Sequence, residues 1–175
     1  MAINRPKKGE FAPFHETYLS VVPKGNVVVL LKKTLKQTQA AFAAYPPETH
    51  DRAYAEGKWT LKQKLAHMID TERVFAFRAL WFSKKDRQAQ PGFNQDDWME
   101  QTDVSGRTLA DLLKELKSVR ENTIFIAKNM TDEQSKFIGT ASNWPVSART
   151  MIFSVVGHNI HHLNLLRDRY SVLLP

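Results

Sequence analysis

The sequence predicts an all-α fold, a four-helix bundle, and three observations support this prediction. Four long stretches of the 175-residue chain place apolar residues three and four positions apart, the spacing of a buried helix face. Two of these stretches begin with a helix-capping signal. No stretch alternates apolar and polar residues strongly enough to predict a sheet. Because this length suits one sizeable core, we expect residues 1–175 to form a single domain.

The N-terminal part of the chain is not expected to contain a long helix. Residues 1–16 begin with charged residues and no apolar run follows them, so we interpret them as an irregular, loose basic tail rather than a secretory signal. Residues 11–25 contain Pro13, Pro23 and Gly25, which favour an irregular lead-in to the first long helix.

The first two long helices have clear ends. The first is expected at about residues 26–44, and it ends at Tyr45-Pro46-Pro47 because a residue before proline is displaced from helical geometry. The second is expected at about residues 60–83, where Thr60 and Gln63 match the first and fourth positions of a capping box. Its apolar stripe consists of Leu61, Leu65, Met68, Phe75, Ala79 and Phe82.

A long connection, at about residues 84–107, separates the second helix from the third. This length permits a crossover along the bundle, so the second and third helices could run parallel, and loops this long are usually functional. The third helix is expected at about residues 108–130. The fourth is expected to open at Pro145-Val146-Ser147 and to run to about Tyr170.

Charge and cysteine content limit the partners that we expect. The net charge of +7 could attract nucleic acid or an anionic substrate. The basic residues are spread along the chain, however, so we favour a solvated surface and do not expect a nucleic-acid partner. The chain has no cysteine, so any metal must be held by His, Asp or Glu, and this absence fits a cytoplasmic location. No apolar run approaches the roughly 20 residues that span a bilayer.

Three histidines form the strongest candidate site. His158 and His162 lie four residues apart, so their side chains share one helix face at the border of the buried stripe. At 100° per residue His161 falls about 60° from His158 on the opposite side from His162, and we expect it to be turned away. Two imidazoles at this spacing can hold one metal ion. His67 could complete a three-ligand site with open coordination positions, the arrangement of a catalytic metal. A structural role for each histidine is the alternative.

The face of the second helix that carries His67 is mixed in character. It is turned about 140° from the apolar stripe, and Glu72 is turned by a similar angle from His67, so Glu72 is left out of the metal site. We interpret the His67 face as the lining of a polar cleft, with a solvent-facing surface as the alternative. Its other members are Gln63, Thr71, Val74, Arg78 and Trp81.

Several blocks of this chain resemble the DinB superfamily. The segment Trp59–Arg73 resembles the first signature of that family, in which a Trp-Ser/Thr start leads to His-x-x-Asp-x-Glu. The resemblance covers roughly residues 17–170, and the nearest relatives would be YfiT-like metal-dependent hydrolases. The later blocks are Phe75–Leu80, Pro91-Gly92-Phe93, Pro145-Val146-Ser147, Gly157–His162 and Leu166–Tyr170.

The resemblance implies a four-helix bundle in up-down-down-up order. It also implies a divalent metal, zinc or nickel, on three histidines, carried here onto His67, His158 and His162. Related families use a low-molecular-weight thiol, bacillithiol or mycothiol, and such bundles often form homodimers. Relatives often have Glu where this chain has Asn159, and Asn cannot act as a general base. We favour a buried structural amide over a role for Asn159 beside the metal.

The expected function is that of a metal-dependent enzyme acting on a small molecule. Three neutral imidazoles leave the full metal charge to activate water or a thiol, which fits a hydrolase or a thiol S-transferase. A non-catalytic metal-binding or stress-response protein is the alternative.

Three further groups of residues are candidates with an open role. Arg78 could hold a substrate carboxylate or phosphate, or pair with Asp96 or Asp97. Asp70 could orient a metal-bound histidine, or pair with Arg73 or Lys64. Loop aromatic residues could line an apolar pocket or cap the bundle; these are Phe93, Trp98 and Trp144.

Overall fold

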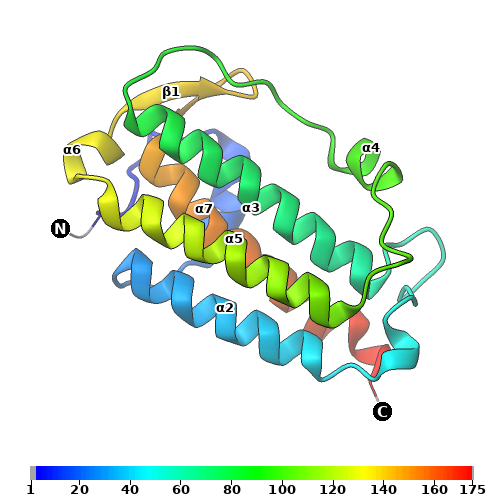
Figure 1. Cartoon of the computed structure of the whole chain (residues 1–175). Helices are drawn as coiled ribbons and strands as arrows, with labels where there is room; N and C mark the ends of the chain where they lie inside the picture. Colours follow the sequence, from blue (N-terminus) through cyan, green and yellow to red (C-terminus); the bar gives the residue numbers. More distant parts are fainter. Residues whose placement is uncertain (1–2, 175) are drawn as a thin grey trace.

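The computed structural model describes residues 3–174, and four long helices dominate it (Figure 1). The predicted all-α four-helix bundle is confirmed, and the only sheet among the described residues is one short hairpin. The long helices are α2 (Val27–Ala43), α3 (Leu61–Ser83), α5 (Leu109–Asn129) and α7 (Ala148–Asp168).

The helices follow the up-down-down-up order. Helices α2 and α7 run in one direction along the bundle and α3 and α5 run in the other (Figure 1). Helix α3 packs against α5 and α7, and α2 packs against the same two helices, so α2 and α3 lie diagonally opposite. The chain between α3 and α5 crosses the length of the bundle, as predicted, and it includes α4 (Gln95–Glu100), a short helix that the sequence analysis did not expect.

Side-chain caps explain where the long helices begin. Thr60 and Gln63 form the predicted capping box at the start of α3, each accepting a hydrogen bond from the other's backbone N–H. Thr108 accepts from the backbone of Asp111 at the start of α5, and Asn26 caps α2. These polar side chains satisfy backbone N–H groups that have no partner within the helix.

A short hairpin precedes α7, and here the predicted start of the fourth helix is wrong. Strands β1 (Ile138–Ala141) and β2 (Trp144–Ser147) pair antiparallel. Between them Ser142 and Asn143 have φ values of 51° and 65°, the left-handed geometry of a two-residue hairpin turn. Pro145 therefore lies in a strand, and α7 begins only after Ser147, whose hydroxyl accepts from the backbone of Thr150.

The N-terminal segment is irregular but packed, so the expectation of a loose tail is wrong. Ile3 and Ala12 are buried. Arg5 donates a hydrogen bond of 2.8 Å to the carbonyl of Val22, and Glu10 accepts one of 2.6 Å from the guanidinium of Arg149. The chain also contains five short helical segments outside the four long helices and α4. They are η1 (Pro13–His15), α1 (Glu16–Leu19), η2 (Pro47–Thr49), α6 (Asp132–Ser135) and η3 (Tyr170–Leu173).

The bundle core has two apolar clusters with polar residues at the level between them. One cluster gathers the second half of α3 and the first half of α7, next to the hairpin. The other gathers the first half of α3 and the last turns of α7. His158, Asn159 and His162 of α7 and Glu72 of α3 are buried at the intermediate level.

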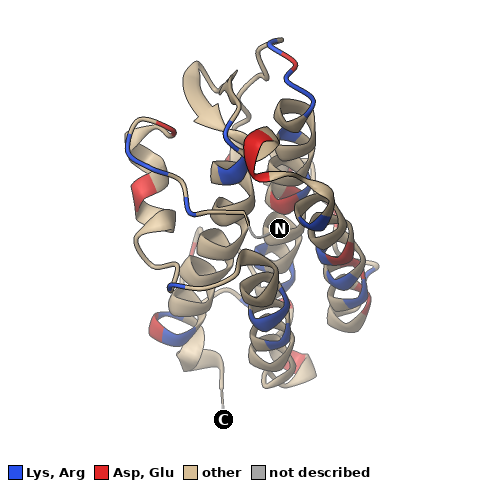
Figure 2. Cartoon of the chain, turned by 90° about the vertical axis from the view of Figure 1, so that its left-hand side faces the viewer, with Lys and Arg blue, Asp and Glu red and all other residues tan. Residues whose placement is uncertain are grey.

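The outer surface is polar and of mixed charge. Basic and acidic positions are interspersed along the helices in the view of Figure 2, with the basic ones prevailing. Within residues 3–174, no helix has both the length and the apolar character needed to cross a membrane.

Candidate metal centre

The structure brings the three predicted histidines together. Nε2 of His158 lies 3.2 Å from Nε2 of His67 and 2.9 Å from Nε2 of His162. The ligand atoms that the three residues offer all lie within 4.8 Å of one another. Two imidazole nitrogens about 2.1 Å from one ion are separated by about 3.0 Å in octahedral and about 3.4 Å in tetrahedral geometry. The separations of 2.9 and 3.2 Å are close to these values.

Burial keeps these imidazoles neutral. The pKa of His67 is lowered to about 3, first by burial and then by the nearby charge of Lys64. Burial also lowers the pKa of His158 and of His162 well below the ordinary value. Because a metal binds the neutral imidazole, all three rings have the protonation state that ligation requires near neutral pH.

Neighbouring helices position the three rings. Helix α3 supplies His67 and the adjacent, antiparallel α7 supplies His158 and His162. A Cβ atom at Gly157 would lie only 2.2 Å from the carbonyl oxygen of Tyr18, so glycine allows α1 to approach the backbone of α7 closely. This approach places the ring of Tyr18 edge-on to His158, with ring centroids 5.4 Å apart.

Aromatic residues surround the cluster, and one of them also lines a cavity. The ring of Trp59 lies 4.8 Å from that of His67, and Phe75 lies 6.0 Å from His158. The ammonium of Lys64 lies 4.3 Å from the centre of the Trp59 ring. Trp59 and Lys64 line a cavity of about 210 Å³, whose lining includes none of the three histidines.

The donor set fits a divalent cation. Three nitrogens of neutral rings converge. Each neutral imidazole has one nitrogen that carries a proton and one that offers a lone pair, so each ring can present a lone pair to a cation. Within the described chain the only hydrogen-bonding contacts of these converging nitrogens are to one another. Borderline cations such as zinc and nickel favour imidazole ligands. Nδ1 of His162 is buried and has no partner in residues 3–174, so no carboxylate or carbonyl fixes that ring.

A second buried polar cluster lies one turn farther along α3. Glu72 accepts hydrogen bonds of 2.7 and 2.8 Å from Arg120 of α5 and one of 2.8 Å from Thr123. Arg120 also donates to the carbonyl of Leu31 and the hydroxyl of Thr34 in α2. Glu72 thus lies outside the histidine cluster, as the helix angles indicate, and ties three helices together.

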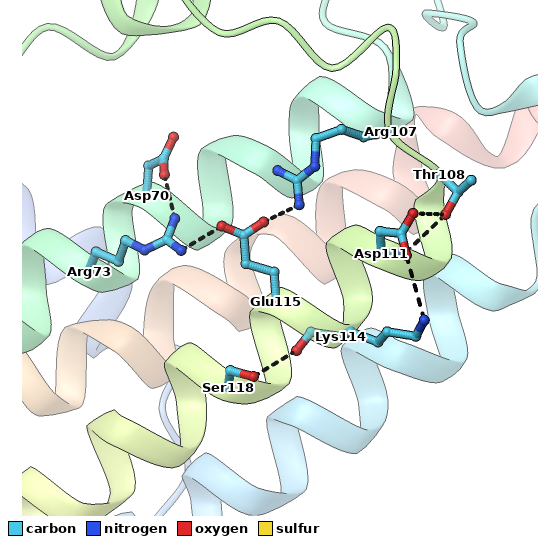
Figure 3. A network of polar contacts seen from close by, with 8 residues as sticks. All are labelled: Asp70, Arg73, Arg107, Thr108, Asp111, Lys114, Glu115 and Ser118. Atoms are coloured by element: carbon cyan, nitrogen blue, oxygen red, sulfur yellow. Dashed lines mark hydrogen bonds and ion pairs between the residues drawn. The ribbon is translucent and has the colours of Figure 1, made fainter.

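Asp70 does not orient a histidine. Its carboxylate accepts a 3.1 Å hydrogen bond from Arg73, whose guanidinium also reaches Glu115 at 2.5 Å (Figure 3). Among the described residues no hydrogen bond joins Asp70 to His67. The ion pair with Arg73 is therefore the correct one of the two alternatives for Asp70.

Arg78 and Asn159 likewise lie away from the three imidazoles. Arg78 is buried and donates to the carbonyl of Pro91, so the alternative of an ion pair with Asp96 or Asp97 is wrong. Asn159 is buried and its Oδ1 accepts a 3.0 Å hydrogen bond from Thr38. The amide oxygen is therefore bonded as expected for a structural amide, whereas Nδ2 is buried and has no partner in residues 3–174.

Two of the three loop aromatics line a pocket, as one of the alternatives predicted. Phe93 and Trp98 line a cavity together with Arg78, in agreement with an apolar pocket. Trp144 lies in β2, away from that cavity, and its side chain is about half exposed. His161, expected to be turned away, is partly exposed and is not one of the three clustered histidines.

A family model matches most of this chain. The model of the DinB superfamily matches residues 30–166. The chain belongs to the DinB superfamily. The match includes the helices that carry all three clustered histidines, and it confirms the resemblance found in the separated sequence blocks.

Similar proteins carry names that refer to metal-dependent hydrolysis. Two curated proteins are named "Putative metal-dependent hydrolase". The one from Oceanobacillus iheyensis is 24% identical over 118 residues, which cover 66% of this chain and 67% of the relative. The one from Geobacillus thermodenitrificans is 22% identical over 128 residues, which cover 71% of each.

A solved structure shares the fold of this DinB-superfamily chain. YfiT from Bacillus subtilis, described as a "probable metal-dependent hydrolase with an unusual four-helix bundle topology", superposes with a TM-score of 0.74. The superposition covers 98% of this chain and 94% of YfiT at 14% sequence identity. At this identity the likeness establishes the bundle and its topology.

Sequence reasoning missed several residues around the cluster. Lys64 lies three residues before His67, so helical spacing alone could have placed both on one side of α3. Trp59 is part of the quoted signature but was given no contact with His67. Tyr18 and Arg120 come from other helices, and only tertiary packing brings them to the intermediate level of the bundle.

Proposed function

We propose that this protein is a metal-dependent enzyme that activates water or a thiol for attack on a small electrophilic molecule. Its ligands are His67, His158 and His162, and zinc or nickel is the expected ion. The observation that carries the proposal is the convergence of three buried, neutral imidazole nitrogens, two pairs of which are 2.9 and 3.2 Å apart. The names of its superfamily relatives are consistent with a hydrolase.

When bound, a divalent ion held by three neutral ligands supplies a Lewis acid that lowers the pKa of a coordinated water or thiol. The protein's own residues prepare the site for this chemistry. Trp59, Phe75 and Tyr18 pack against the imidazoles and limit their rotation. Preorganised ligands of this kind reduce the reorganisation that accompanies reaction.

Lys64 is the nearest cationic candidate for contact with a substrate. Its side chain is buried, lies over Trp59, which contacts His67, and lines the 210 Å³ cavity. Burial lowers the pKa of Lys64 to about 8, and the negative charge of Asp96 opposes this shift. A protonated Lys64 stabilises negative charge that develops on a substrate oxygen in the cavity.

Turnover assays test the proposal. The zinc- or nickel-loaded protein is assayed on a panel of activated esters and amides, and with electrophiles in the presence of bacillithiol or mycothiol. We expect multiple turnovers that fall at least a hundredfold in His158→Ala and persist in His161→Ala, which removes a neighbouring imidazole outside the cluster. Water as acceptor identifies a hydrolase and a thiol acceptor an S-transferase. Tight metal binding without turnover on any of these substrates contradicts the enzymatic proposal and favours a non-catalytic metal-binding protein.

We also propose a partner, a location and an oligomeric state. The partner is a small molecule, and the absence of cysteine fits work in a reducing cytoplasm. A homodimer is expected from the family resemblance, and sedimentation of the purified chain tests it.

A further inference from the structure

A second cavity lies between α3 and the crossover chain that leads to α4. Its volume is about 370 Å³, a size that suits a small organic ligand. It is lined along α3 and closed by the crossover segment and α4. The lining side chains that matter here are Asp70, Arg73, Val74, Arg78, Phe93 and Trp98.

Arg78 brings a buried and uncompensated positive charge to this cavity. Its side chain is 94% buried, since 6% is exposed. Nη2 donates to the carbonyl of Pro91 at 2.5 Å and contacts the hydroxyl of Ser142 at 3.4 Å, and both partners are neutral. No carboxylate in residues 3–174 lies within ion-pair distance of Arg78, and its Nε and Nη1 groups donate to no protein atom there. A buried charge without a counter-ion is unfavourable, so an anion in the cavity would relieve a real cost.

Arg73, on the same helix and in the same cavity, provides the contrast. Its guanidinium is paired with Asp70 and with Glu115, which in turn pairs with Arg107 (Figure 3). The charge of Arg73 is therefore already neutralised within the protein. Asp70, Arg73 and Arg78 are the only charged residues among those that line the cavity, which leaves one positive charge uncompensated there.

Apart from Gln90, the rest of the cavity wall is apolar and includes aromatic rings. The rings of Phe93 and Trp98 lie 4.6 Å apart with an interplanar angle of 36°. The guanidinium carbon of Arg78 is 6.0 Å from the centre of the Phe93 ring. Val74 of α3 adds an aliphatic surface. A planar apolar group can stack on this wall while an anionic group reaches Arg78.

The charged residue that marks this cavity lies well along α3 from the histidine cluster. Arg78 is eleven positions after His67, which at 1.5 Å per residue corresponds to about 16 Å along the helix axis. None of the three histidines lines the cavity. We therefore assign it to a site distinct from the metal centre.

We propose that this cavity is a second binding site, which takes a small molecule carrying a carboxylate or phosphate group on a flat aromatic body. The oxoanion pairs with the free N–H groups of Arg78, and the aromatic body stacks against Phe93 and Trp98. This inference goes beyond the proposed metal chemistry and does not depend on a bound ion.

Isothermal titration of the full chain with 2-naphthoate tests the site, with 2-naphthyl phosphate in parallel to establish which oxoanion is preferred. We expect saturable binding of at least one of them, with and without a chelator present. The neutral analogue 2-naphthamide should bind at least about tenfold more weakly, because it cannot form a charge-assisted pair. Arg78→Met should weaken the anionic probe by at least about tenfold.

Matched variants separate this site from the metal centre. Lys85→Gln removes an exposed charge that Glu133 already pairs and that does not line the cavity, and binding should change less than about threefold. Trp98→Ala keeps Arg78 and the bundle core, and it should weaken binding about three- to tenfold, so the proposal is tested even if Arg78→Met does not fold. Binding should be unchanged in His158→Ala. Absence of saturable binding in the wild type, unchanged binding in a folded Arg78→Met, or loss of binding in His158→Ala would overturn the proposal.

Discussion

The core of the bundle contains two buried polar clusters that differ in how completely their polar atoms are hydrogen-bonded. Around Glu72, Arg120 forms a bidentate ion pair and Thr34, Thr123 and a backbone carbonyl complete the hydrogen bonds. In the histidine cluster three nitrogens face one another, and the buried Nδ1 of His162 has no partner in the described chain. Both clusters use α3, and their first members lie only five residues apart.

This difference indicates which cluster is structural and which is a ligand site. A fully paired buried network holds helices in register and has no unused polar atom with which to bind a ligand. Converging neutral nitrogens without partners gain little from one another and much from a cation. The two clusters are both buried, and they are distinguished by whether their polar atoms have hydrogen-bond partners. The predictions below test this distinction, beginning with the largest effect.

Removal of Glu72 should strongly destabilise the fold. Glu72→Ala leaves the completely buried Arg120 without its counter-ion, and we expect a loss of about 3–5 kcal/mol in the free energy of unfolding, measured with urea. The exposed pair of Lys85 and Glu133 provides the control. Glu133→Ala should cost less than about 1 kcal/mol. Equal losses in the two variants would mean that the buried network is not structural.

Metal should stabilise the protein only through the histidine cluster. Zinc at a free concentration a hundredfold above its dissociation constant should raise the free energy of unfolding by about 2.7 kcal/mol, because the folded state alone presents the preformed site. His162→Ala should lose this gain in a thermal scan with and without zinc. Equal stabilisation of wild type and His162→Ala would place the ion elsewhere.

Acid should weaken the metal-free protein through the same histidines. The pKa of His67 is about 3 in the folded chain against an ordinary value of 6.5, so between these values only the unfolded chain takes up the proton. Stability is then complete above about pH 6.5 and falls as the pH is lowered toward 3. Between pH 7 and pH 5 His67→Asn should lose about 2 kcal/mol less than wild type, measured by urea unfolding in chelator. An identical pH dependence would contradict a buried neutral His67.

Asn159 should affect stability slightly and metal binding not at all. Thr38→Val removes the donor to Oδ1 of Asn159, and we expect a cost of about 1 kcal/mol from the lost hydrogen bond. Zinc affinity should stay within about twofold of wild type. A large loss of affinity would give Asn159 a role in supporting the ion.

Local signals in the sequence predicted the bundle well. The capping box at Thr60 and Gln63 located the start of α3 because the cap is formed by neighbouring residues. The hairpin before α7 was missed because each of its strands has only four residues, too few for a clear alternation. The buried N-terminal segment was missed because the partners of Arg5 and Glu10 are distant in sequence or belong to the backbone.

The sequence predicted the three histidines of the candidate site but not their surroundings. The spacing of His158 and His162 places both on one face of a helix, and the family signature indicated that His67 joins them. The partners of Asp70 and Arg78 could be narrowed to alternatives but not chosen, since helix geometry does not reveal which side chain lies across the bundle. The proximity of Trp59 to His67 and of Lys64 to Trp59 is seen only in the contacts of the folded chain.

Direct titration of zinc into the metal-free protein is the measurement that tests the central claim most closely. The account predicts one ion per chain for wild type, none for His158→Ala, and one for His161→Ala, in which the adjacent imidazole outside the cluster is removed. Stoichiometric binding that survives in His158→Ala, or loss of binding in a folded His161→Ala, would contradict a metal centre built from His67, His158 and His162.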